Sequence, residues 1–162
     1  MEKNNRLLHQ MISYYAKDPK RIQHFLKVYQ FAKFIGEEEG LDHNTQHILE
    51  TAAIVHDIGI KKAERIYGNC SGKYQEELGP EEAEHMLREL GYQPDVVERV
   101  CYLVGHHHTY TNVEGLDYQI LIEADFLVNL YEDHVETDGC RKAMDNIFRT
   151  ETGKSLLQKM FL

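Results

Sequence analysis

Asp125 stands out because an ionisable side chain occupies a position where helical spacing calls for an apolar one. It lies four residues after Leu121 and three residues before Val128, within the mostly apolar run of residues 120–128. A buried carboxylate without a partner is costly, so the position predicts a partner. Taken alone, Asp125 either pairs with a basic side chain, caps a neighbouring helix or binds a metal ion.

Histidine is abundant, with 10 of 162 residues, and several histidines face inward. His56 follows Ala52 on the inward stripe of a predicted helix, and Asp57 comes next, where the chain turns. This pair offers an imidazole nitrogen and a carboxylate that can bridge two cations. His24 lies one turn from Val28 on another buried helix. Together these residue types favour metal binding.

A run of three histidines follows a further predicted helix. His107 lies three residues after Val104 and continues its apolar stripe, so it is expected to project inward. His106 and His108 flank that direction, and at a helix end either can join it. His85 points nearly opposite to the packing face of its own helix, which by helical phase alone predicts a surface position.

The elements that must position these residues are predicted to be helices. The chain contains only 11 Gly and 3 Pro, which favours long regular elements over a fold of many hairpins. Asp18 is expected to cap a helix that has Pro19 in its first turn. The sequence therefore predicts an all-α protein of about eight helices. Further expected features are a loop over residues 68–75, a helix opened by Pro80 and closed by Gly91, and final segments over residues 138–150 and 154–162.

Charge and composition limit the partners. The chain carries 27 acidic and 18 basic side chains, for a formal net charge of −9. Duplex nucleic acid and anionic membranes need clustered Lys and Arg, so neither is an expected partner. A small anionic substrate would need a local positive centre, and a metal ion is the obvious candidate.

Targeting signals and cysteine usage point to the cell interior. No stretch reaches the roughly 20 consecutive apolar residues of a membrane span, and the N-terminus lacks the build of a signal peptide. Cys70, Cys101 and Cys140 have no Cys-x-x-Cys spacing, which favours reduced thiols. We therefore expect a cytoplasmic protein.

In chain order, the inward set is His24, His56-Asp57, the run of residues 106–108 and Asp125. This order resembles the HD superfamily of metal-dependent phosphohydrolases. Residues 54–59 match the His-Asp-Ile-Gly form of its motif, and residues 123–125 resemble the helix with its closing aspartate. The resemblance implies a single HD domain over residues 1–162, with a motif core of about 24–131 and C-terminal helices over 138–162.

The resemblance also implies a set of metal ligands. One ion is bound by the first histidine, the His-Asp pair and the last aspartate. In dinuclear members the paired aspartate bridges a second ion, which a histidine on an intervening helix and later histidines complete. Mixed imidazole and carboxylate ligands suit Fe, Mn, Co, Ni or Zn better than Ca. The implied ligands of one or two ions are His24, His56, Asp57, His85, His106, His107 and Asp125. His108 is the alternative to His106. The resemblance also implies that Asp57 is the catalytic residue.

The activity that the resemblance implies is hydrolysis of a phosphate monoester or diester of a small nucleotide-like substrate, through a metal-activated water. Candidate phosphate contacts are Arg21, Lys61 and Lys73. Glu123 is one candidate to orient a ligand histidine. The subfamily is open, because Ile60 directly follows the motif and no Gly-Tyr-Pro signature is present. The sequence also leaves the oligomeric state open. The alternative is a catalytically silent module that binds metal or nucleotide for regulation.

Overall fold

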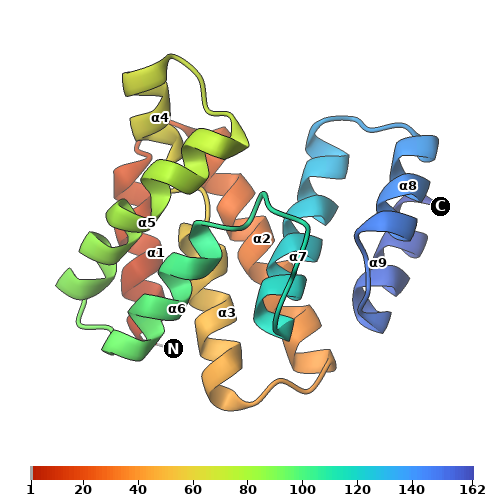
Figure 1. Cartoon of the computed structure of the whole chain (residues 1–162), viewed down its shortest axis with the longest axis horizontal. Helices are drawn as coiled ribbons and strands as arrows, with labels where there is room; N and C mark the ends of the chain where they lie inside the picture. Colours follow the sequence, from red (N-terminus) through yellow and green to blue (C-terminus); the bar gives the residue numbers. More distant parts are fainter. Residues whose placement is uncertain (1) are drawn as a thin grey trace.

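The computed structural model describes residues 2–162, and α-helices are the regular elements of that part of the chain. This confirms the all-α prediction, and Figure 1 shows how the helices pack. Among residues 2–162 no helix combines the length and the apolar character needed to cross a membrane. The nine helices of this range are α1 (Glu2–Tyr14), α2 (Pro19–Glu38), α3 (His43–Val55), α4 (Ile60–Tyr67), α5 (Gly72–Glu89), α6 (Pro94–Val104), α7 (Leu116–Glu132), α8 (Thr137–Asn146) and α9 (Glu151–Phe161).

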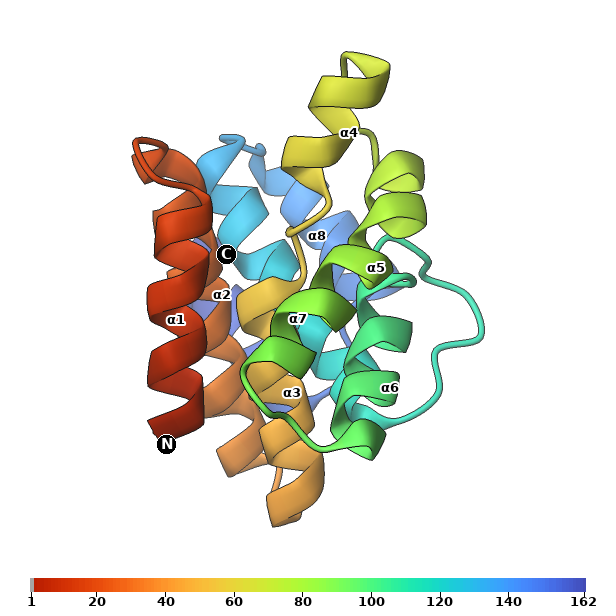
Figure 2. The same ribbon diagram turned by 90° about the vertical axis from the view of Figure 1, so that its left-hand side faces the viewer.

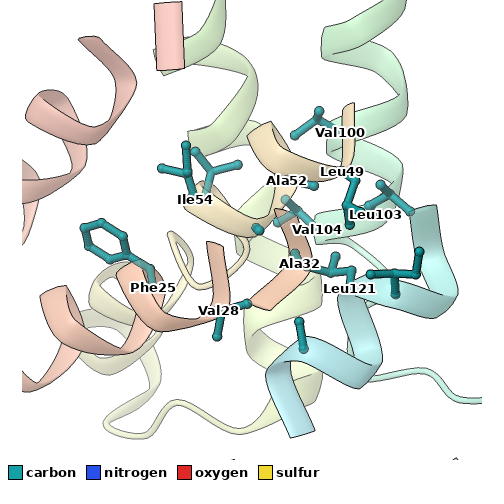
Figure 3. Close-up of a cluster of buried hydrophobic side chains, with 14 of the residues drawn as sticks. Phe25, Val28, Ala32, Leu49, Ala52, Ile54, Val100, Leu103, Val104 and Leu121 are labelled. Carbon is teal, nitrogen blue, oxygen red and sulfur yellow. The ribbon is translucent and has the colours of Figure 1, made fainter. Parts of the chain in front are cut away.

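The centre of the bundle is formed by α2, α3 and α7. Helix α2 packs against both α3 and α7, and α6 packs on α3. Helix α1 packs on another side of α3, α9 packs on α7, and α8 packs on α9 (Figures 1 and 2). Buried apolar side chains from α2, α3, α6 and α7 meet in the core that Figure 3 shows: Phe25, Val28, Ala32, Leu49, Ala52, Ile54, Val100, Leu103, Val104 and Leu121.

Local signals set the start of two inner helices. Asp18 caps α2 by accepting a hydrogen bond from the Arg21 backbone N–H, with Pro19 in the first turn, as predicted. Asp42 caps α3 in the same way through the N–H of Thr45. These caps satisfy backbone donors that the helix itself leaves free.

The observed start of α5 differs from the predicted loop over residues 68–75 and from the predicted helix start at Pro80. It begins at Gly72, so residues 72–75 are helical and Pro80 lies inside the helix. A proline there removes one helical hydrogen bond. Close packing on the turn after α3 accompanies this loss: a Cβ on Gly59 would lie 2.8 Å from the backbone nitrogen of Gly79. This tertiary contact is invisible to local sequence signals.

The C-terminal helices also differ from their expected bounds. Helix α8 ends at Asn146 rather than near residue 150, and Phe148 beyond it is fully buried. Helix α9 begins at Glu151 rather than at residue 154, because the Thr150 side chain accepts from the Gly153 N–H and caps it.

The connection between α6 and α7 loops outward beyond α6 before α7 begins (Figure 2). Its first turn carries the three histidines. The Tyr118 hydroxyl lies 2.9 Å from the His106 carbonyl oxygen and also contacts that of Thr109. Helix α7 thereby fixes the turn in which His107 and His108 lie.

Candidate metal centre

Four inner elements bring ionisable side chains to one point. His24 lies on α2, Asp125 lies in the middle of α7, and His56 and Asp57 form the turn directly after α3. His107 lies in the turn directly after α6. The side chains of His56 and His107 are almost completely buried, and His24 and Asp125 are buried as well. The structure therefore brings together residues that are up to 101 positions apart in the sequence.

Four of these residues form a first donor set. The His24 Nε2 atom lies 3.1 Å from Asp125 Oδ1 and 3.1 Å from Asp57 Oδ2. The His56 Nε2 atom lies 3.3 Å from His24 Nε2, 3.4 Å from Asp57 Oδ2 and 3.5 Å from Asp125 Oδ1. Within residues 2–162, the contacts of Asp125 are these imidazoles and the Asn129 amide rather than a lysine or arginine.

The hydrogen bonds of the Nδ1 atoms of His24 and His56 determine whether their Nε2 atoms carry a hydrogen or a free lone pair. The His56 Nδ1 lies 2.7 Å from the Ala53 carbonyl oxygen, and the His24 Nδ1 lies 2.6 Å from Glu132 Oε1. Both partners are acceptors, so each Nδ1 carries a hydrogen and donates it. In the neutral imidazoles, the Nε2 lone pairs then face each other and the carboxylate oxygens. These nitrogen and oxygen lone pairs repel one another unless a cation lies among them.

The shifted pKa values of the site residues also indicate that the first donor set favours positive charge. Burial lowers the pKa of His24 and of His56, but hydrogen bonds and charges of Asp125 and Asp57 outweigh it and raise the pKa values to about 11 and about 10. Burial raises the pKa of both aspartates, yet the histidines hold those pKa values below the ordinary range. A divalent metal ion would supply comparable charge at one point.

A second donor set shares Asp57. Its Oδ1 lies 3.5 Å from His107 Nε2, and a carboxylate oxygen of Asp57, a ring nitrogen of His107 and one of His108 lie within 4.8 Å of one another. The Gln75 Oε1 lies 2.9 Å from His108 Nε2 and 3.3 Å from His107 Nε2. Because His107 Nδ1 lies 2.7 Å from the Val104 carbonyl oxygen, its Nε2 again faces other acceptors. Asp57 thus directs one oxygen to each donor set.

The spacing of the first set fits a transition metal ion. Protein nitrogen and oxygen atoms bind such ions at about 2.0–2.2 Å, so four donors around one ion lie roughly 3.0–3.5 Å apart. The two imidazole nitrogens of the first set lie 3.3 Å from each other and 3.1–3.5 Å from the carboxylate oxygens of Asp57 and Asp125. Imidazole and carboxylate donors suit Fe, Mn, Co, Ni or Zn, whereas Ca²⁺ prefers oxygen donors throughout.

The donor sets open onto a cavity of about 390 Å³. Arg21 lines it, although its guanidinium lies 3.0 Å from both Asp18 and Glu64. Lys20 also lines it, and the sequence offered no signal for that residue. The remaining lining residues, apart from the donor sets and Gln75, are Asp18, Ile60, Cys70, Asn129, Glu132 and Asp133.

His85 is not part of the site, contrary to the position implied by the resemblance. Its side chain is 80% exposed, and its Nε2 lies 3.5 Å from Glu89 on the outer face of α5. Helical phase by itself placed it correctly at the surface. Helix α5 instead contributes Gln75, which sequence reasoning missed because residues 68–75 read as a loop.

Of the three consecutive histidines, the structure joins His107 with His108 and not with His106. The His106 ring stacks on Tyr102 with centroids 4.1 Å apart, and its Nδ1 lies 2.7 Å from the Tyr102 carbonyl oxygen. The turn after α6 therefore directs His107 and His108 to the second donor set and His106 to Tyr102. His108, the alternative in the sequence analysis, takes the place expected of His106.

The two candidate lysines lie away from the cavity lining. The Lys61 amine donates to the Tyr14 carbonyl oxygen at 2.9 Å and lies over the Tyr14 ring, while Lys73 is exposed on α5. Glu123 is fully buried, but it accepts hydrogen bonds from the backbone N–H groups of Arg149 and Thr150. It thus stabilises the start of α9 and does not orient a site histidine.

Glu132 contacts a site histidine in place of Glu123. It lies seven residues after Asp125, which puts both on one face of α7. This spacing was the signal in the sequence that could have identified Glu132.

An all-helical bundle with buried histidines and aspartates around a cavity defines a metal-binding helical domain. The family model described as HD domain matches residues 21–146, most of the chain, and the chain therefore belongs to the HD domain family. HD domains are generally metal-dependent hydrolases. The match confirms the family expected from the order of the inward residues. Comparison with curated proteins and with solved structures found no match.

Proposed function

We propose that this chain is a phosphohydrolase that cleaves a phosphate monoester or diester of a small nucleotide-like substrate through a metal-activated water. The observation that carries the proposal is the pair of donor sets that share Asp57 at a cavity. Divalent ions at these donor sets would supply a water of lowered pKa and positive charge for phosphoryl oxygens. The chain itself, with a net charge of −9, has little positive charge to offer.

The donor residues divide into two proposed ligand groups. His24, His56, Asp57 and Asp125 would hold the first ion, and Asp57, His107 and His108 would hold the second, with the Gln75 Oε1 as a further donor. The first group contains two carboxylates and the second only the shared one, so the first ion is expected to bind more tightly. We assign Asp57 as the catalytic residue, because its two oxygens face different donor sets and it would bind both ions.

The cavity supports a small substrate. Its volume of about 390 Å³ falls at the lower end of the range of small-molecule sites. Lys20 and Arg21 line it and offer cationic contacts for phosphate oxygens. We further propose that the chain forms a single HD domain, since one buried apolar cluster includes Leu7 of α1 and Leu157 of α9.

One observation favours the alternative of a silent metal-binding regulatory module. The carboxylates of Asp18, Glu132 and Asp133 line the same cavity, and Arg21 is already paired. An anionic substrate must therefore approach against negative charge unless both ions are present.

The deciding experiment assays metal-loaded protein against phosphomonoesters, cyclic nucleotides and dinucleoside polyphosphates. We expect turnover of at least one class, its loss on chelation, and a loss of about 100-fold or more in Asp57→Ala as a ligand to both ions is removed. His85→Ala, a histidine outside the site, is the control and should retain activity. Full metal occupancy without turnover of any substrate would support the regulatory module instead.

A further inference from the structure

We propose that Glu132 is a positioning residue that fixes the ring of His24, so that its Nε2 faces Asp57 and Asp125. The inference rests on the proposed metal centre and adds a residue outside both donor sets. It concerns how the metal-binding orientation of one histidine is maintained.

The three most buried site histidines obtain their orientation in two ways. His56 and His107 lie in turns, and each Nδ1 donates to a backbone carbonyl three residues earlier, on Ala53 and Val104. His24 lies inside α2, where the carbonyl groups already accept helical hydrogen bonds. Its Nδ1 therefore needs a side-chain acceptor from another helix.

Helix α7 supplies that acceptor. The Glu132 Oε1 lies 2.6 Å from His24 Nδ1, while its Oε2 lies 2.7 Å from the Lys27 amine. Each carboxylate oxygen thus has one donor, and the side chain is only 12% exposed.

The contacts form a short network between two helices. Helix α2 contributes His24 and, one turn later, Lys27, and α7 contributes Asp125 and Glu132 on one face. One end of the His24 ring is held by Glu132 while the other end faces the donor set. A carboxylate on the outer nitrogen also raises the basicity of the inner one, and losing such a partner typically costs 10–100-fold in metal affinity.

The test measures zinc affinity of the full chain by competition with a chromogenic chelator. We expect Glu132→Ala to weaken the first ion by about 10–100-fold, and Glu132→Gln, which keeps an acceptor oxygen, by less. Asp133→Ala is the matched control, since Asp133 is the next carboxylate, lines the same cavity and is exposed. It should leave affinity nearly unchanged.

A second readout separates positioning from general damage to the fold. In zinc-loaded wild type, long-range ¹H–¹⁵N spectra should show the His24 proton on Nδ1 and the metal on Nε2, and in Glu132→Ala this single arrangement should be lost. Equal affinity losses in Glu132→Ala and Asp133→Ala would overturn the inference and leave the proposed function intact. Wild-type protein that binds no zinc, manganese or iron would overturn the metal centre and this inference together.

Discussion

Asp57 is the residue on which both donor sets depend, because one of its oxygens faces each set. Its position follows from the turn after α3, where Tyr15 donates a hydrogen bond of 2.7 Å to the Asp57 carbonyl oxygen. The chemistry of the site at this scale is a competition between protons and metal ions for the same atoms. That competition has a measurable pH dependence.

The prediction at the residue scale concerns pH. The pKa values of His24 and His56 in the metal-free protein, about 11 and about 10, lie above the ordinary value of 6.5. Near pH 7 an incoming ion must displace one or two protons, so the apparent affinity should rise by about 10- to 100-fold per pH unit. Calorimetry in two buffers of different ionisation enthalpy counts the protons released. Affinity that is independent of pH between 6 and 8 would contradict the assignment.

The same shifts set the stability of the metal-free protein. Because the folded pKa values of these histidines are raised, their contribution to stability is present below the unfolded pKa and is lost as the pH rises towards 10 and above. Asp57 and Asp125 have lowered pKa values, so their contribution is present above the unfolded pKa and is lost on acidification. Metal-free protein should therefore be most stable at mildly acidic pH.

At the scale of elements, α5 decides the composition of the second donor set. It approaches the turn after α3 through the backbone contact of Gly59 and Gly79, and this contact positions its first turns beside His107 and His108. The helix therefore presents Gln75 inward, whereas His85 near its other end faces solvent.

The prediction at this scale compares two residues of α5. Gln75→Ala should weaken the second ion by about tenfold, because it removes an oxygen within reach of that position. His85→Ala should leave both the number and the affinity of bound ions unchanged. Metal titration followed by elemental analysis measures both quantities. A lower metal content in His85→Ala alone would reverse the assignment of α5.

For the whole molecule, the donor sets connect segments that are distant in the chain. His24 and Asp125 are 101 residues apart, yet their side chains lie 3.1 Å apart. An ion in the first donor set would therefore link α2, α7 and the turn after α3, and an ion in the second set would link the turns after α3 and α6. Since the unfolded chain cannot hold these groups together, metal binding should stabilise the fold.

The prediction at this scale is a thermal shift. At a free metal concentration of about 100 times Kd, the wild type should gain about 2.7 kcal/mol, which corresponds to roughly 5–10 °C in Tm for a chain of this size. Asp125→Asn lacks a charged donor and should gain much less. The comparison uses the difference between loaded and metal-free protein for each variant, so that any effect on the metal-free fold cancels. An equal gain in both proteins would exclude Asp125 as a ligand.

The sequence alone determined the helical class, the family and the inward direction of His24, His56, Asp57, His107 and Asp125. These features are readable because the period of 3.6 residues and the local caps decide which face of a helix is buried. The same local rule correctly predicts that His85 lies at the surface, whereas the family resemblance implied that it binds metal.

The tertiary structure alone decided which of these groups meet and what holds them. Gln75 joins the second donor set because α5 continues past Pro80 and packs on the turn at Gly59, and neither fact is local. His108 rather than His106, and Glu132 rather than Glu123, follow from contacts between residues 33 and 108 positions apart in the chain. Periodicity specifies the face on which a side chain lies, but the packing of one helix against another specifies which atom it reaches.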